Sequence, residues 1–93
     1  MRFTWDEAKR QSNLRKHGYD FADAHRVFAS EVLLSEDGRN DYGEQRKIAL
    51  GVLDTVIVAI VHIESDETIR IISMRKGDKD ETNLYFEQIG LGG

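Results

Sequence analysis

The sequence has no cysteine, no proline and no long hydrophobic run. Because cysteine is absent, the chain can form neither disulfides nor zinc–thiolate sites, and nothing in it indicates an oxidising compartment. No apolar stretch approaches the roughly 18 residues that a transmembrane helix needs, so we expect no membrane span. The opening MRFTWDEAKR is too polar for a secretory signal peptide, and we therefore expect a cytoplasmic protein.

Cations are also in the minority, with 13 Lys and Arg against 17 Asp and Glu and a formal net charge of −4. That total argues against a nucleic-acid partner, but the charges are unevenly distributed. Residues 9–26 contain five Lys or Arg against two Asp, and residues 69–79 contain four against one. This clustering predicts one basic and one acidic face, whereas scatter over a solvated surface is the alternative interpretation.

The 93 residues are enough for one domain, and no linker, repeat or low-complexity tract divides them. We therefore predict a single domain over residues 1–93. A short strand over 2–5 is expected to come first, because RFTW alternates and carries two aromatic side chains.

Two helices are predicted next. Asp6 is a suitable N-cap for a helix over 7–17, which Gly18 would end. Asp20 would cap a second, shorter helix over 21–29. The apolar face of this second helix is formed by Phe21, Ala24, Val27 and Phe28.

From residue 31 the pattern becomes that of strands joined by short connections. The stretch DGRNDYGE over 37–44 is rich in turn-forming residues and predicts a turn. Because short connections favour antiparallel neighbours, we predict a four-stranded meander. Its strands are expected over 31–37, 45–52, 55–63 and 68–75, the third of them apolar enough to be covered on both faces.

The last segment, DKDETNLYFEQIG over 78–90, predicts a helix with Leu84, Tyr85 and Ile89 facing inward. The predicted order is therefore β-α-α-β-β-β-β-α. This order favours an α+β fold in which an antiparallel sheet packs against helices on one side.

Four stretches together are similar to the BrnT family of toxins from type II toxin–antitoxin operons. They are FTWDEAKRQSNLRKHG, FADAHRVF, DGRNDYGEQRKIALG and VHIESDETIRIISMRK, and they occur in order and spacing over residues 3–76. The resemblance implies a RelE-like fold, growth arrest, and an endoribonuclease activity that needs no metal or other cofactor. It also implies a ribbon-helix-helix antitoxin, encoded alongside, which forms a 2:2 complex with the toxin and through which alone the toxin meets DNA.

The strand segment IRIISMRK carries Arg70 and Arg75, and buried guanidinium groups are costly unless they are paired. A planar guanidinium matches phosphate oxygens, so these two arginines are candidates for holding RNA phosphates during cleavage. Being five residues apart, they lie on opposite faces of a regular strand unless a bulge intervenes. The alternative interpretation gives each an ion pair with an acid such as Glu44 or Glu64.

Cleavage also requires proton transfer, for which histidine is suited near neutral pH. We predict His17, in the KHG element that the family resemblance supports, as the proton carrier. Lys16 and His17 equally complement the negative end of the helix dipole, which alone would explain them. His62, within an apolar strand, is predicted to be a satisfied core histidine.

The stretch DYGEQR supplies further candidates. Glu44 and Arg46 share a strand face, so they would form either a catalytic acid–cation pair or a surface salt bridge. The remaining RNA-binding candidates are Tyr42, which could stack on a base or pack against the sheet, and Lys76. No pair of histidines has the spacing typical of a metal site, so no metal is predicted.

Two functions are compatible with these residues. The first is the metal-independent endoribonuclease toxin, with His17, Glu44, Arg46, Arg70 and Arg75 at the catalytic site. The alternative is a non-catalytic toxin that acts only as an antitoxin-binding co-repressor, which the net charge of −4 and the acidic last helix favour.

Overall fold

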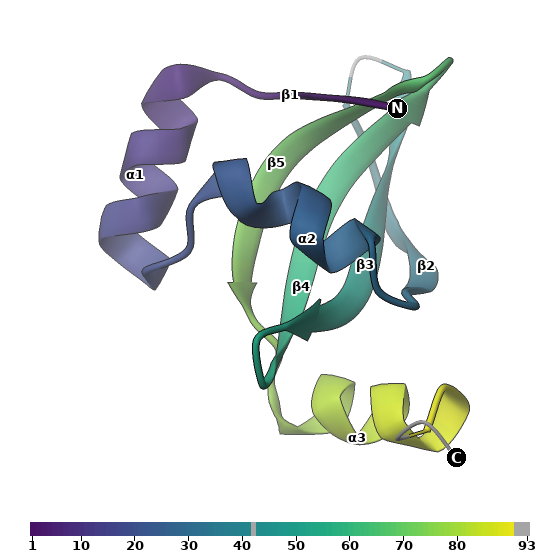
Figure 1. Ribbon diagram of the computed structural model, residues 1–93. Helices are drawn as coiled ribbons and strands as arrows, with labels where there is room; N and C mark the ends of the chain where they lie inside the picture. The colour runs from purple at the N-terminus through teal and green to yellow at the C-terminus, as the bar shows by residue number, and fades with distance from the viewer. Residues whose placement is uncertain (42, 91–93) are drawn as a thin grey trace.

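The computed structural model describes residues 1–41 and 43–90, with only the backbone described for 39–41. It has a five-stranded sheet in the order β1-β5-β4-β3-β2, with α-helices and one 3-10 helix around it (Figure 1). None of the described helices is long and apolar enough to cross a membrane. The elements are β1 (Arg2–Thr4), α1 (Glu7–His17), η1 (Phe21–Asp23), α2 (Ala24–Phe28), β2 (Leu33–Asp41), β3 (Glu44–Leu53), β4 (Val56–Ser65), β5 (Thr68–Lys76) and α3 (Lys79–Gln88).

The predicted helix caps are confirmed. The Asp6 side chain accepts a hydrogen bond from the Lys9 backbone N–H at 3.1 Å, and α1 ends at Gly18 in the left-handed conformation (φ 78°). Asp20 caps the next segment in the same way, accepting from the backbone N–H of Ala22 at 2.9 Å. That segment begins as the 3-10 helix η1 before it continues as α2.

The meander of β2, β3, β4 and β5 is also confirmed, but the predicted turn over 37–44 is wrong for most of its length. Strand β2 continues to Asp41 instead of ending at residue 37. Its pairing with β3 shifts register between Glu36 and Asn40, and Gly38 within that interval has a φ of 79°. A bulge thus absorbs the turn-forming residues, and the strand continues beyond it.

The sheet is mixed rather than antiparallel, because β1 pairs with β5 in parallel, Phe3 lying opposite Ile69. The helices also cover both faces, so the predicted placement on one side is wrong. Helix α2 crosses one face, whereas α3 lies by the end of β4 and β5 (Figure 1). Along β4, Val58 and Ile60 belong to the cluster under α2, while Ile57 and Ala59 pack with Tyr85 of α3. Successive side chains of a strand point to opposite faces, so the two clusters mark the two sides.

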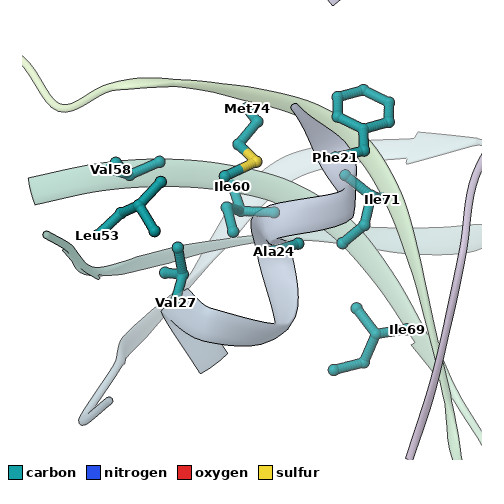
Figure 2. Packing of buried hydrophobic residues seen from close by; sticks show 9 residues of the cluster. All are labelled: Phe21, Ala24, Val27, Leu53, Val58, Ile60, Ile69, Ile71 and Met74. Carbon is teal, nitrogen blue, oxygen red and sulfur yellow. The ribbon is translucent and has the colours of Figure 1, made fainter. Parts of the chain in front are cut away.

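The main core lies between η1, α2 and the sheet, as the apolar periodicity predicted. Phe21, Ala24 and Val27 are completely buried against β4 and β5 (Figure 2). Phe28 is half-buried at the border of this cluster. Gly51 of β3 allows α2 to approach closely, because a Cβ there would meet the Val27 side chain at 2.8 Å.

Helix α3 is fixed by its ends and by one aromatic side chain. Asp78 and Glu81 form a reciprocal capping box at its start. Tyr85 is buried, and its hydroxyl donates to the Glu31 carbonyl at 2.8 Å. Ile89, one turn later, packs against the same cluster as predicted. Leu84 was predicted to face inward but is 43% exposed, since neighbouring helix positions are about 100° apart and Tyr85 takes the inward one.

Candidate functional site

A bulge in β5 decides where the two strand arginines lie. Ile71 pairs with His62 and Ser73 pairs with Val61, so Ile72 is an extra residue that has no opposite partner on β4. Ile71 and Met74, although three apart, consequently both enter the core under α2. Arg70 and Arg75, although five apart, both lie on the other face. The bulge that is needed to bring both arginines onto one face is therefore present.

We call this other side of the sheet the arginine face, defined by Arg46, Arg70 and Arg75. Ile63 of β4 has Arg46 of β3 opposite it on one side and Arg70 of β5 opposite it on the other. Arg46, Ile63 and Arg70 therefore form a row across the three strands. Two strand spacings place the Cα atoms of the two arginines about 10 Å apart. Arg70 is exposed, and it forms no ion pair or side-chain hydrogen bond with any residue that the structure describes.

Arg75 is engaged by α3. Its two terminal nitrogens donate to the two carboxylate oxygens of Glu81 at 2.6 and 2.9 Å. This bidentate contact holds the pKa of the Glu81 carboxyl below its usual value and raises the pKa of Arg75. The ion pair expected as the alternative therefore exists, but its acid is Glu81 rather than Glu44 or Glu64.

Glu64 lies on the opposite face and has other partners. His62, which is completely buried, contacts the Glu64 carboxylate through Nε2 at 2.9 Å, and Lys47 lies 3.6 Å from the other carboxylate oxygen. The hydrogen bond with His62, followed by the charge of Lys47, lowers the pKa of Glu64. The ring of His62 also meets Phe28 edge-on at 5.1 Å. The prediction of a satisfied core histidine is confirmed.

Helix α1 lies along β5 beyond the point where β1 ends (Figure 1). The buried Asn13 side chain replaces a neighbouring strand there. Its Nδ2 donates to the Met74 carbonyl at 2.8 Å, and its Oδ1 accepts from the Met74 N–H at 3.2 Å. Nδ2 also donates to the Tyr19 carbonyl at 3.1 Å. The backbone N–H and C=O of Met74 at the edge of β5 are thereby satisfied, and α1 is held against this edge.

An open groove of about 220 Å³ runs between α1 and β5, and we call it the α1 groove. Lys16 and His17, both predicted site residues, line it together and are exposed. Ser73 lines it from the strand and lies on the arginine face, between the positions of Arg70 and Arg75. The lining residues are Lys9, Ser12, Asn13, Lys16, His17, Ile72 and Ser73.

Two predicted residues, Glu44 and Lys76, do not line the α1 groove. Glu44 is exposed at the start of β3 and shares its face with Arg46, two residues on. Lys76 lies opposite Val58, so it is on the face that α2 covers rather than on the arginine face. Tyr42 lies outside the described residues.

Sequence reasoning missed Asn13, Ser73 and Glu81. Asn13 gave no usable signal, because the neighbouring Leu14, from which the buried side of α1 would be read, is itself 39% exposed. Glu81 could have been found as the third residue after the cap Asp78, where a capping box places glutamate. Ser73 gave none, because its face depends on the bulge.

The histidines do not assemble a metal site in the part of the chain that the structure describes. No three His, Asp or Glu side chains among residues 1–38 and 43–90 are grouped closely enough to hold an ion. His25 is exposed, with its Nδ1 2.9 Å from the Ala22 carbonyl. The α1 groove presents two lysines, His17 and two serine hydroxyls, which suit an anionic ligand such as a phosphate.

Comparison with known families agrees with this chemistry. The family model described as "Ribonuclease toxin, BrnT, of type II toxin-antitoxin system" matches residues 5–81. The chain therefore belongs to the BrnT family of ribonuclease toxins, whose type II systems pair a toxin with an antitoxin. No individual curated protein matches the sequence.

Proposed function

We propose that the protein is a metal-independent endoribonuclease whose site lies where the arginine face meets the α1 groove. The observation that carries this proposal is the register of β5. Arg70 lies opposite Ile63, as Arg46 does, and the bulge at Ile72 puts Ser73, which lines the groove together with His17, on the same face. An exposed arginine on the arginine face and a histidine in the α1 groove would supply the two requirements of RNA cleavage, charge stabilisation and proton transfer.

In the proposed reaction His17 takes the proton of the ribose 2′-hydroxyl. The 2′-oxygen attacks the adjacent phosphorus, and the bond from phosphorus to the 5′-oxygen breaks. His17 returns the proton to the departing 5′-oxygen, so a 2′,3′-cyclic phosphate remains. Arg70 and Arg46 stabilise the doubly charged phosphorane, which is the point at which fixed cations lower the barrier most.

The other predicted site residues take supporting positions in this proposal. Glu44 shares the face of Arg46 and would orient it, while Lys16 would hold a phosphate next to His17. Arg75 contacts RNA only through the part of its guanidinium that Glu81 leaves accessible, since the side chain is 34% exposed. Lys76 lies on the other face, so we place it outside the site.

Cleavage of a labelled single-stranded RNA in buffer with a chelator tests the proposal. We expect Arg70→Ala to lower kcat/KM about 100-fold or more, and His17→Ala by about 100- to 10,000-fold. Arg15→Ala is the matched control, because Arg15 is exposed on the same helix, lies outside the groove and has no partner among the described residues. The mechanism is wrong if the chelator abolishes cleavage or if Arg70→Ala cleaves at the wild-type rate.

We further propose that a ribbon-helix-helix antitoxin neutralises the toxin in a 2:2 complex, and that only the antitoxin contacts DNA. An antitoxin segment laid over the arginine face would cover the phosphate-binding groups, so its affinity should fall as salt rises. Light scattering of the co-expressed pair measures the stoichiometry. A 1:1 mass, or an affinity that is constant over a wide salt range, would contradict this arrangement.

A growth assay tests whether the proposed RNA cleavage affects bacteria. Because the proposed substrate is RNA, we expect the protein to act in the cytoplasm. Induction of the wild type should arrest bacterial growth, and the Arg70→Ala, Arg75→Ala double variant at equal abundance should not. The pairing of Arg75 with Glu81 of the acidic α3 favours the second candidate, a non-catalytic co-repressor. Antitoxin binding with normal growth and no RNA cleavage would establish that second function.

A further inference from the structure

The α1 groove contains polar side chains that the cleavage step does not use. Lys9 and Ser12 line it on the same side of α1 as Lys16, with the 9, 12, 16 spacing of one helix face. Ser73 contributes a hydroxyl from the strand. None of these four side chains forms a hydrogen bond or ion pair with any residue that the structure describes.

Some cations outside the groove are paired with acids. Arg10, on the same helix, is held by Glu7 and by Asp20, with contacts of 2.6 and 3.0 Å. Arg26 is likewise paired with Asp54 at 2.6 Å. In a chain with a net charge of −4, no Asp or Glu is among the described residues that line the groove. Unpaired cations with hydroxyls and without carboxylates are the composition of an anion-binding surface.

We infer that the α1 groove is a second phosphate subsite, in which Lys9, Ser12 and Lys16 hold the backbone of a single RNA strand next to the scissile phosphate. This inference rests on the proposed function and adds three points to it. It assigns Lys9 and Ser12 a binding role, it predicts that the RNA crosses the edge of β5, and it predicts that the substrate is single-stranded.

The shape of the site supports a single strand. Ser73 belongs to both the groove and the arginine face, so one backbone can pass from Arg70 over Ser73 into the groove that Lys9 and Lys16 line. Grooves of this kind track the backbone of single strands. Because the contacts are to phosphate, they carry no base preference and their strength depends on salt.

Fluorescence anisotropy with a labelled RNA of about 12 nucleotides tests the subsite. All sugars of the probe carry 2′-fluorine, so the strand cannot be cleaved. Each phosphate contact to a single strand contributes about 0.7 to the slope of log affinity against log salt. We expect Lys9→Gln and Lys16→Gln each to reduce the magnitude of that slope by about 0.7. Arg15→Gln, which removes the same charge from the same helix outside the groove, should leave the slope unchanged.

Cleavage of an unmodified RNA of the same length separates binding from chemistry. Lys9→Gln should raise KM about 3- to 10-fold with kcat unchanged, because the contact is made equally before and during the reaction. If wild-type protein binds and cleaves RNA but Lys9→Gln behaves as Arg15→Gln does, the subsite is refuted and the proposed function survives. If the wild type binds no RNA, while Lys9→Gln weakens only the complex with the antitoxin, both proposals are refuted and the groove is a protein-binding site.

Discussion

Replacing Asn13 with alanine removes the side chain that connects α1 to the edge of β5. Three hydrogen bonds are lost, two with the Met74 backbone and one with the Tyr19 carbonyl. Each typically contributes about 1 kcal/mol, and a buried partner left unsatisfied costs about as much again. We therefore expect Asn13→Ala to lower the free energy of unfolding by about 2–4 kcal/mol.

That loss is large for a domain of this size, whose total stability is of the order of 5–15 kcal/mol. It corresponds to a fall in Tm of roughly 10–30 °C. Urea denaturation gives the free energy, and hydrogen exchange at the Met74 amide reports the local contact. Ser12→Ala is the control, since Ser12 is the preceding residue and its side chain has no partner among the described residues. It should change stability by less than about 0.5 kcal/mol.

Asn13→Asp sharpens the test. The carboxylate keeps an acceptor for the Met74 N–H but faces the Met74 and Tyr19 carbonyls without a proton to donate. At neutral pH this variant should be at least as unstable as Asn13→Ala. The difference in unfolding free energy between Asn13→Asp and the wild type should become smaller as the introduced carboxylate is protonated at low pH. The reasoning fails if Asn13→Ala costs less than about 0.5 kcal/mol, or if Asn13→Asp is as stable as the wild type at pH 7.

Two further predictions concern packing and charge. Gly51→Ala should lower the unfolding free energy by about 1–3 kcal/mol, because the added Cβ would lie 2.8 Å from the side chain of the fully buried Val27. Urea titration measures this change, and an unchanged midpoint of unfolding would contradict the prediction. Since the pKa of Glu81 is lowered in the fold by Arg75, its stabilisation is complete above the ordinary carboxyl pKa and is lost as pH falls through the lowered one. Glu81→Gln should therefore cost about 1–2 kcal/mol at pH 7 and progressively less in acid, whereas a pH-independent cost would exclude the ion pair as the cause.

Local signals in the sequence were sufficient for most of the fold. Side-chain caps at Asp6 and Asp20, the left-handed Gly18 and the apolar run of β4 all depend on neighbouring residues, and all were predicted correctly. The errors concern pairings between distant segments. The parallel docking of β1, the bulge at Gly38 and the position of α3 on the second face depend on register, which no short stretch encodes.

In the candidate site, too, the sequence indicated individual residues but not the contacts between distant segments. The sequence indicated that arginines on an isoleucine-rich strand and the histidine that ends α1 were unusual. It could not place Arg70 and Arg75 on one face, because that depends on which residue of β5 lacks a partner on β4. The sequence also could not show that Glu81 forms an ion pair with Arg75, or that Asn13 holds α1 against the edge of β5 through hydrogen bonds.

The distribution of ion pairs resolves the apparent conflict between the negative net charge and an RNA substrate. Several acids pair with cations outside the groove, among them Glu81 with Arg75 of the arginine face. The lysines of the α1 groove and Arg70 have no carboxylate partner among the described residues, and no described Asp or Glu lines the groove. A phosphate approaching the site meets this local field more strongly than the distant surplus of acids, which salt screens beyond about 8–10 Å. The formal charge therefore does not argue against RNA binding. These pairs include Arg10 with Glu7 and Asp20, Arg26 with Asp23 and Asp54, Lys47 with Glu64, and Arg75 with Glu81.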